Sequence, residues 1–187
     1  MKKLSRRSTL VTSGAVLAAV AAGTVGAVTA NASSPAAPAA APAAAPAAKG
    51  GATTSTTHLT LASATKAAQA ALDAAKKENQ KVSVAVVDRN GNTVLTLRGD
   101  GAGPQAYEAA EKKAFTAVSW NAPTSELAKR LDKAPTLKDI PGTLFLAGGA
   151  PVAAQGAPIA GIGVAGAPSG DLDEKFAQAG VDSLHLR

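Results

Sequence analysis

Apolar and polar positions along the chain repeat with two different periods, which predict helices in some segments and strands in others. Small apolar residues recur every three or four positions across residues 61–79, as on one face of an amphipathic helix. Residues 82–87 and 93–97 are rich in β-branched and aliphatic side chains, which is typical of strands. The Asn-Gly pair within residues 88–92 predicts a tight hairpin turn between them.

The middle of the chain is predicted to be helical. Residues 105–120 carry strong helix formers, and the Asn-Ala-Pro sequence at 121–123 ends this helix. Thr124 is a good helix cap, so a third helix is expected over residues 124–133. A closing helix is expected to begin at Ser169 or Asp171 and to end near residue 183.

Three short apolar runs between these helices are predicted to be strands. Glycine- and proline-rich turns at residues 148–151 and 156–158 separate the runs, which cover residues 144–147, 152–155 and 159–164. Together with the first two strands they make five. The sequence therefore predicts an α+β fold with α/β/α layers, in which helices flank a five-stranded, mainly antiparallel sheet.

The first 57 residues are not predicted to belong to this fold. Residues 1–32 combine basic residues, a short apolar stretch and an Ala-Asn-Ala cleavage site, which is typical of an export signal. The paired Arg6 and Arg7 favour the twin-arginine route over an ordinary secretory signal. Residues 33–57 form a Pro/Ala-rich linker, either a semi-rigid tether or low-complexity filler. We expect a secreted, extracellular or wall-associated protein whose folded domain spans residues 58–187.

Removal of the signal changes the charge of the protein and the classes of partner that suit it. The whole chain has 19 basic and 13 acidic residues, and four of the basic ones lie in residues 1–32, so the remainder carries a net charge of +2. With few aromatic residues there is no basic-aromatic surface for nucleic acid. No segment reaches the roughly 18 apolar residues of a membrane span, so we expect no membrane insertion. The absence of cysteine excludes disulfides and thiol chemistry.

Residues 161–166 match the G-x-G-x-x-G pattern of dinucleotide-binding loops. That function needs a following helix and then a further parallel strand, whereas here the chain ends in the helix. We therefore interpret these glycines as positions where the sheet packs closely against a helix.

Few side chains offer catalytic or metal-binding chemistry. Glu108 and Glu111 lie three apart on a predicted helix, so both carboxylates share a face that suits ferric iron or calcium. The alternative is a solvated face on which Lys112 and Lys113 act as counter-charges. His58 is either a solvated residue or a metal or haem ligand. No hydroxyl residue has a plausible histidine base nearby in the sequence, so a redox role would depend on a bound cofactor.

Five stretches of the folded region carry a family resemblance. They are residues 82–91 (VSVAVVDRNG), 101–105 (GAGPQ), 113–117 (KAFTA), 141–143 (PGT) and 161–166 (GIGVAG). In this order they resemble the GlcG/HbpS family over nearly all of residues 58–183. The resemblance implies a profilin-like fold, assembly as a homo-octamer, and binding of haem and iron ions. It also implies partnership with a membrane sensor histidine kinase that responds to redox stress.

The same resemblance implies roles for individual residues. Thr143 falls where an oxygen ligand to haem iron is expected, and Glu108 and Glu111 fall on an iron-binding acidic pair. His58 matches a histidine near the start of the domain, whereas Lys81 stands where another histidine is expected. Because a neutral hydroxyl is a weak iron ligand, we expect modest and exchangeable haem binding.

The remaining haem contacts would come from apolar walls and from cations that meet the propionates. We expect the walls from Leu144, Phe145 and Leu146, and the cations from Lys112 or Lys113. The resulting hypothesis is an extracytoplasmic haem- and iron-binding accessory protein that modulates the kinase. The alternatives are a haem-dependent peroxidase-like or haem-degrading protein, and a small-molecule binding module of GlcG type.

Overall fold

The computed structural model describes residues 50–185. The predicted export signal and residues 33–49 of the predicted linker lie outside these residues, while residues 50–57 are exposed and form no helix or strand. The elements in chain order are α1 (Leu61–Lys77), β1 (Ser83–Asp88), β2 (Thr93–Arg98), α2 (Pro104–Trp120), α3 (Thr124–Ala128), the 3-10 turns η1 (Lys129–Asp132) and η2 (Pro135–Asp139), β3 (Gly149–Ala154), β4 (Ala157–Ala165) and α4 (Gly170–Asp182). Within residues 50–185, no helix is both long and apolar enough to cross a bilayer.

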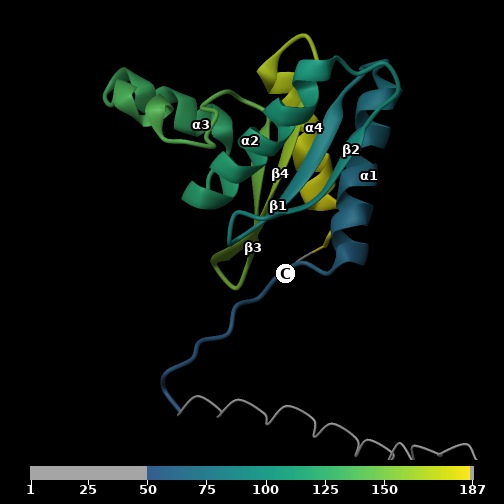
Figure 1. The fold of residues 1–187 in the computed structure, drawn as a ribbon. Coiled ribbons are helices and arrows are strands. Elements are labelled where there is room, and N and C mark those ends of the chain that lie inside the picture. The colour runs from purple at the N-terminus through teal and green to yellow at the C-terminus, as the bar shows by residue number, and fades with distance from the viewer. Residues whose placement is uncertain (1–49, 186–187) are drawn as a thin grey trace, which may run out of the picture. The chain divides into compact units, whose positions relative to one another are not determined.

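A single antiparallel sheet with strand order β2-β1-β4-β3 lies between two helical layers (Figure 1). Alternate residues of β1 point to opposite faces: Val84 and Val86 join the core under α1 and α4, whereas Ala85 and Val87 join the core under α2. Burial on both faces explains why this strand is continuously apolar. The predicted α/β/α arrangement is confirmed.

The prediction of five strands is wrong, because the sheet of residues 50–185 has four. Residues 144–147 form an irregular segment, and Gly149, which was assigned to a turn, already begins β3. The segment bonds elsewhere: the backbone N–H of Leu144 donates to the Thr116 hydroxyl of α2 (2.8 Å). Phe145 is buried in a separate cluster beside Trp120 and Leu127. The apolar character of residues 144–147 therefore reflects packing beneath α3 and not membership of the sheet.

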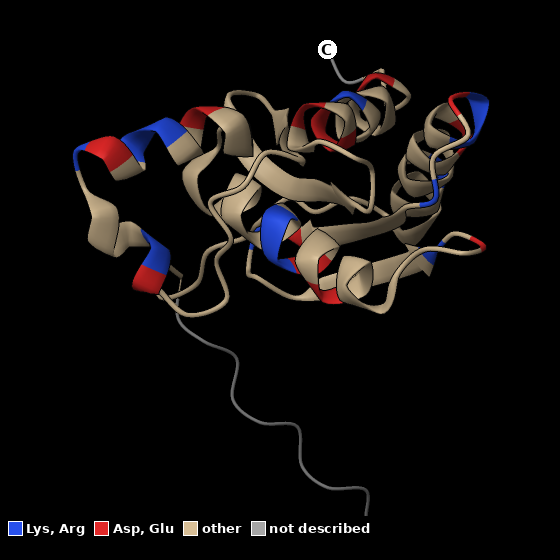
Figure 2. Cartoon of the chain, turned by 90° about the horizontal axis from the view of Figure 1, so that it is seen from above, with Lys and Arg blue, Asp and Glu red and all other residues tan. Residues whose placement is uncertain are grey.

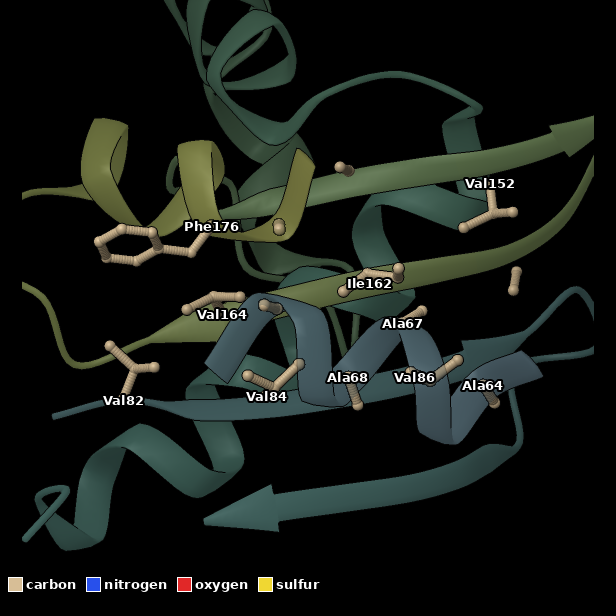
Figure 3. Close-up of a cluster of buried hydrophobic side chains, with 14 of the residues drawn as sticks. Ala64, Ala67, Ala68, Val82, Val84, Val86, Val152, Ile162, Val164 and Phe176 are labelled. Carbon is tan, nitrogen blue, oxygen red and sulfur yellow. The ribbon is translucent and has the colours of Figure 1, made fainter. Parts of the chain in front are cut away.

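Small side chains on α1 let this helix and α4 approach the sheet closely (Figure 3). The buried residues of α1 are Ala64, Ala67, Ala68, Ala71 and Ala75. Across from them, the strands supply larger branched side chains such as Ile162 and Val164. The apolar stripe predicted on this helix is confirmed at its alanines, whereas Leu61, the first residue of α1, is 64% exposed.

Two glycines of β4 bring the sheet into direct contact with α2. A Cβ atom at Gly161 would lie 2.2 Å from the Ala114 carbonyl oxygen, and one at Gly163 would lie 2.0 Å from the Ala110 carbonyl oxygen. No side chain fits in this space, so the backbones of strand and helix touch. The interpretation of the glycine-rich segment as a packing motif is confirmed.

The region after α2 is more divided than the sequence suggested. The helix predicted over residues 124–133 consists of α3 followed by the 3-10 turn η1, and η2 was not predicted. Positively and negatively charged residues alternate along α3, η1 and η2, which together we call the arm (left in Figure 2). The arm packs its few apolar residues on Phe145 and leads directly into the segment that carries Thr143.

Candidate functional site

The candidate haem ligand Thr143 lies in the loop between η2 and β3, and it is half-buried. Its hydroxyl donates a hydrogen bond to the Ile140 carbonyl oxygen (2.7 Å). A hydroxyl that uses its proton in this way keeps its lone pairs available to accept a bond. The oxygen can therefore still accept a bond, as a ligand to a metal ion must.

Two exposed apolar side chains lie on either side of Thr143 along the chain. Ile140 is 40% exposed and Leu146 is 52% exposed, and they are two of four large apolar side chains exposed within residues 50–185. Of the three predicted apolar walls, only Leu146 is well exposed. Phe145 is wrong as a wall, because it is buried edge-to-face against Trp120 with ring centroids 5.2 Å apart. Ile140 was missed, although an apolar residue next to a proline in a loop was a usable signal.

The loop that carries Thr143 is anchored to α2 near its start and to α3 at its end. Gly142, at a positive φ of 79°, packs against the ring of Phe115. The hydroxyl of buried Thr116 accepts from the backbone of Leu144 and itself donates to the Lys112 carbonyl oxygen (2.7 Å). At the far end, the Gly149 backbone N–H donates to the Thr124 hydroxyl (2.7 Å). These contacts hold a loop of exposed apolar residues in a defined position.

The two glutamates of the candidate iron site lie on one face of α2, as predicted, but in different surroundings. Glu108 is exposed and pairs with Lys112 (2.6 Å). The hydrogen bond from Lys112 and then its charge lower the pKa of the Glu108 carboxyl, which is therefore ionised at neutral pH. Glu111 is half-buried and accepts a hydrogen bond from the Thr96 hydroxyl of β2 (2.8 Å).

His58 does not join this acidic pair. Its Nδ1 lies 3.7 Å from the Asp88 carboxylate, and its Nε2 lies 2.7 Å from the Thr56 hydroxyl. Burial raises the pKa of the Asp88 carboxyl, but hydrogen bonds from Asn92 and Asn90 and the charge of His58 outweigh it, so this pKa lies below its ordinary value. Within residues 50–185, no three His, Cys, Asp or Glu residues gather as a metal site. The predicted metal-binding residues therefore lie at two separate places, with Glu108 and Glu111 on α2 and His58 beside Asp88.

The two lysines that were expected to face solvent differ in the exposure of their side chains. Lys112 is 42% exposed, whereas Lys113 is 2% exposed. The ammonium of Lys113 donates to the Asp173 carboxylate of α4 (2.8 Å) and to the Val164 carbonyl oxygen of β4 (3.0 Å). The prediction of Lys113 as a solvated counter-charge is wrong, because its partner lies 60 residues away and no local pattern reveals it.

The buried ion pair also changes the titration of its acid. Burial raises the pKa of the Asp173 carboxyl, and the hydrogen bond and charge of Lys113 offset this only in part. The backbone N–H of Ala167 donates to the other carboxylate oxygen (2.9 Å). Each carboxylate oxygen of Asp173 therefore accepts a hydrogen bond.

Lys81, which replaces an expected histidine, is exposed and lies over the loop after β2. A Cβ at Gly101 would lie 2.9 Å from its Cδ atom, so Gly101 leaves room for this side chain. Lys81 also borders a cavity of about 470 Å³ together with Arg98 and Asp100. This cavity adjoins neither Thr143 nor the acidic pair.

Comparison with known proteins gives a consistent family. The model of the family described as haem degrading protein HbpS-like matches residues 59–182. A crystal structure of a Streptomyces reticuli HbpS double mutant, in which two glutamates three positions apart are aspartates, is 76% identical with a TM-score of 0.73. That match covers 75% of this chain and 97% of the mutant's.

Two more distant relatives also match this chain. The crystal structure of a PduOC:haem complex is 25% identical with a TM-score of 0.64, and the match covers 70% of this chain and 98% of that chain. A 15.0 kDa protein of Citrobacter freundii, encoded between dhaT and dhaS, is 32% identical over 129 residues. Those residues are 66% of this chain and 90% of the relative.

Proposed function

The chain belongs to the family of HbpS-like haem degrading proteins, and on this premise we propose that it binds haem at the loop between η2 and β3. The observation that carries the proposal is Thr143, whose hydroxyl has free lone pairs and stands between the exposed Ile140 and Leu146. An oxygen ligand flanked by apolar side chains matches the two needs of haem, a bond to iron and contact with the porphyrin face.

The chemistry of this loop favours reversible binding. Haem supplies redox chemistry at its iron, and the protein supplies position and surroundings. A neutral hydroxyl donates less to iron than imidazole or thiolate does, so apolar contact provides most of the affinity. Such a site suits a protein that acquires and releases haem according to supply.

Support for haem also comes from the relatives. The PduOC structure is a haem complex, and the HbpS structure is the nearer of the two in sequence. By similarity to these proteins, we place this chain among haem-binding members of the family. The family's description names haem degradation, which favours a haem-degrading or peroxidase-like enzyme as the second candidate function.

Replacement of Thr143 with valine is expected to weaken haem binding about tenfold and to move the Soret band, because valine keeps the shape but removes the oxygen. Replacement with serine keeps the hydroxyl and should leave the band near its original position. Titration of each protein with haemin, followed at the Soret maximum, measures both effects. An unchanged band and affinity in Thr143→Val would remove Thr143 from the site.

We further propose that Glu108 and Glu111 bind iron ions at the surface of α2. They have the spacing of the two glutamates replaced in the HbpS double mutant, and carboxylates are suitable ligands for a hard cation. The protein with Glu108→Gln and Glu111→Gln together is expected to bind ferrous iron at least about tenfold more weakly, measured by calorimetry under argon. Glu126→Gln, at an exposed position of α3, is the matched control, and equal loss in both proteins would contradict the assignment.

The wider role that we propose is that of an accessory sensor. In this role a secreted homo-octamer, exported by the twin-arginine signal of residues 1–32, binds haem and iron outside the membrane. It then modulates a membrane sensor histidine kinase. Support for export comes from the composition of the first 32 residues, and support for the sensing role comes from the exchangeable binding that a threonine ligand allows.

A further inference from the structure

The loop that carries Thr143 is tied to α2 by one hydrogen bond. The Leu144 backbone N–H donates to the Thr116 hydroxyl (2.8 Å). Within residues 50–185, this is the one hydrogen bond of residues 140–147 whose partner lies outside both this stretch and η2. Thr116 is fully buried on α2. It therefore provides a fixed point beneath a loop whose other hydrogen bonds are local.

The single proton of the Thr116 hydroxyl sets the direction of its two hydrogen bonds. That proton is donated to the Lys112 carbonyl oxygen (2.7 Å), one turn earlier on α2. The lone pairs of the oxygen are then available to a donor, and the Leu144 N–H uses one of them. A side chain at position 116 must therefore both donate and accept. Serine can do both, whereas valine has the shape of threonine but can do neither.

The bond to Leu144 restricts the backbone on the far side of Thr143. The peptide group between these two residues is planar, so a bond that holds its N–H restricts the ψ angle of Thr143. On the near side, residues 140–143 form a Pro-Gly turn, in which Gly142 has a φ of 79° and the Thr143 N–H donates to the Ile140 carbonyl oxygen (3.3 Å). Because both of its peptide groups are held, the Thr143 side chain leaves the backbone in a defined direction.

We propose that Thr116 is a positioning residue, which directs the hydroxyl of Thr143 toward the iron of a bound haem. This inference rests on the proposed function, because Thr116 is buried and acts only through Thr143. Loss of the Thr116 hydroxyl frees the peptide group after Thr143 and leaves the Leu144 N–H without its acceptor. The oxygen of Thr143 is then present but no longer held in direction. A ligand bond needs its donor atom held closely in place, so the bond to iron weakens.

The first measurement uses the haem-free protein and follows amide hydrogen exchange by NMR. In Thr116→Val the Leu144 amide is expected to exchange at least about tenfold faster, because its acceptor is gone, whereas Thr116→Ser should keep it protected. Thr65→Val is the matched control, since the Thr65 hydroxyl also donates to a carbonyl oxygen one turn earlier (2.9 Å, Leu61) but lies on α1, away from the loop. Unchanged exchange of the Leu144 amide in Thr116→Val would overturn the proposal.

The second measurement is a haemin titration of the same proteins, followed at the Soret maximum. Thr116→Val is expected to bind haemin about fivefold more weakly, with a band moved toward that of Thr143→Val, whereas Thr116→Ser should match the parent protein. The double variant Thr116→Val with Thr143→Val should lose no more affinity than Thr143→Val alone, because Thr116 acts through Thr143. Additive losses in the double variant, or an unmoved band in Thr116→Val, would overturn the proposal.

The variant Ile162→Val separates positioning from a general loss of stability. Ile162 lies in the core under α1 and α4, on the face of the sheet away from α2, and the change removes one buried methyl group. Its Soret band and affinity for haemin should equal those of the parent protein, and weakening equal to that of Thr116→Val would overturn the positioning role. A parent protein with no saturable Soret band would contradict the proposed haem function itself. A normal parent band that stays unmoved in Thr116→Val would contradict the role of Thr116 alone.

Discussion

Replacement of Gly163 with alanine is expected to destabilise the domain by about 3 kcal/mol, near the upper end of the usual cost of overpacking a core. The new Cβ would lie 2.0 Å from the Ala110 carbonyl oxygen and 2.5 Å from the Ala114 backbone nitrogen. Both contacts are with the backbone of α2, which has no flexible end that can move aside. The helix must shift away from β4, and the whole core under α2 is then disturbed.

Urea unfolding followed by circular dichroism measures this effect, with Gly156→Ala as the control. Gly156 lies in the turn between β3 and β4 and has a positive φ of 78°, but a Cβ there would meet no atom within 4 Å. It should therefore cost only the roughly 1 kcal/mol of a left-handed conformation. Equal losses of stability in the two variants would show that the contact between β4 and α2 is not the reason for glycine at 163.

Replacement of Lys113 with methionine is expected to cost about 3–5 kcal/mol, because it leaves the Asp173 carboxylate buried without its cation. The pKa of that carboxyl is already raised by burial, and without Lys113 it should rise further. A second replacement, Asp173→Asn in the same chain, removes the charge and should recover most of the stability. A buried ion pair that is removed as a unit is often close to neutral in stability.

The matched control is Lys112→Met, one position away on α2. Lys112 forms only an exposed ion pair with Glu108, and solvent screens such pairs so that they contribute little to stability. Chemical denaturation at neutral pH of the parent protein, Lys113→Met, Asp173→Asn and the double variant forms a double-mutant cycle, and Lys112→Met is measured beside it. If Lys113→Met and Lys112→Met lost the same small amount, the buried pair would not hold α2, β4 and α4 together as its geometry indicates.

The parts of the fold with a strong local pattern were predictable from sequence. The helix beginning at Leu61, the hairpin around Asn90-Gly91 and the helix that ends before Asn121 follow from periodicity, turn chemistry and capping. The packing role of the glycine-rich segment followed from the close approach that glycine allows between a sheet and a helix. Each of these signals lies within a few residues, so it can be read from the local sequence.

The features that depend on distant partners were not predictable. Residues 144–147 have the composition of a strand, but a hydroxyl on α2 takes the backbone N–H that a strand would use in its ladder. Lys113 has the surroundings of a surface lysine in the sequence, and only its contact with Asp173 explains its burial. Tertiary contacts decided both cases against the local pattern.

The candidate site shows the same division. The shared face of Glu108 and Glu111 followed from helical spacing, and the structure retains it. The separation of His58 from this pair could not be read from spacing, because His58 precedes α1 and bonds Asp88 at the end of β1. Of the apolar residues predicted around Thr143, only Leu146 has a well-exposed side chain, and the structure adds the exposed Ile140.

The most direct test of the central claim, reversible haem binding by this domain, is an equilibrium haemin titration followed by transfer to excess apomyoglobin. We predict a saturable Soret band on addition of haemin, and complete transfer of the haem to the competitor, since a hydroxyl ligand holds iron weakly. Absorbance that rises without saturation would contradict haem binding. Haem that stays on the protein in the presence of apomyoglobin would contradict a threonine-ligated, exchangeable site.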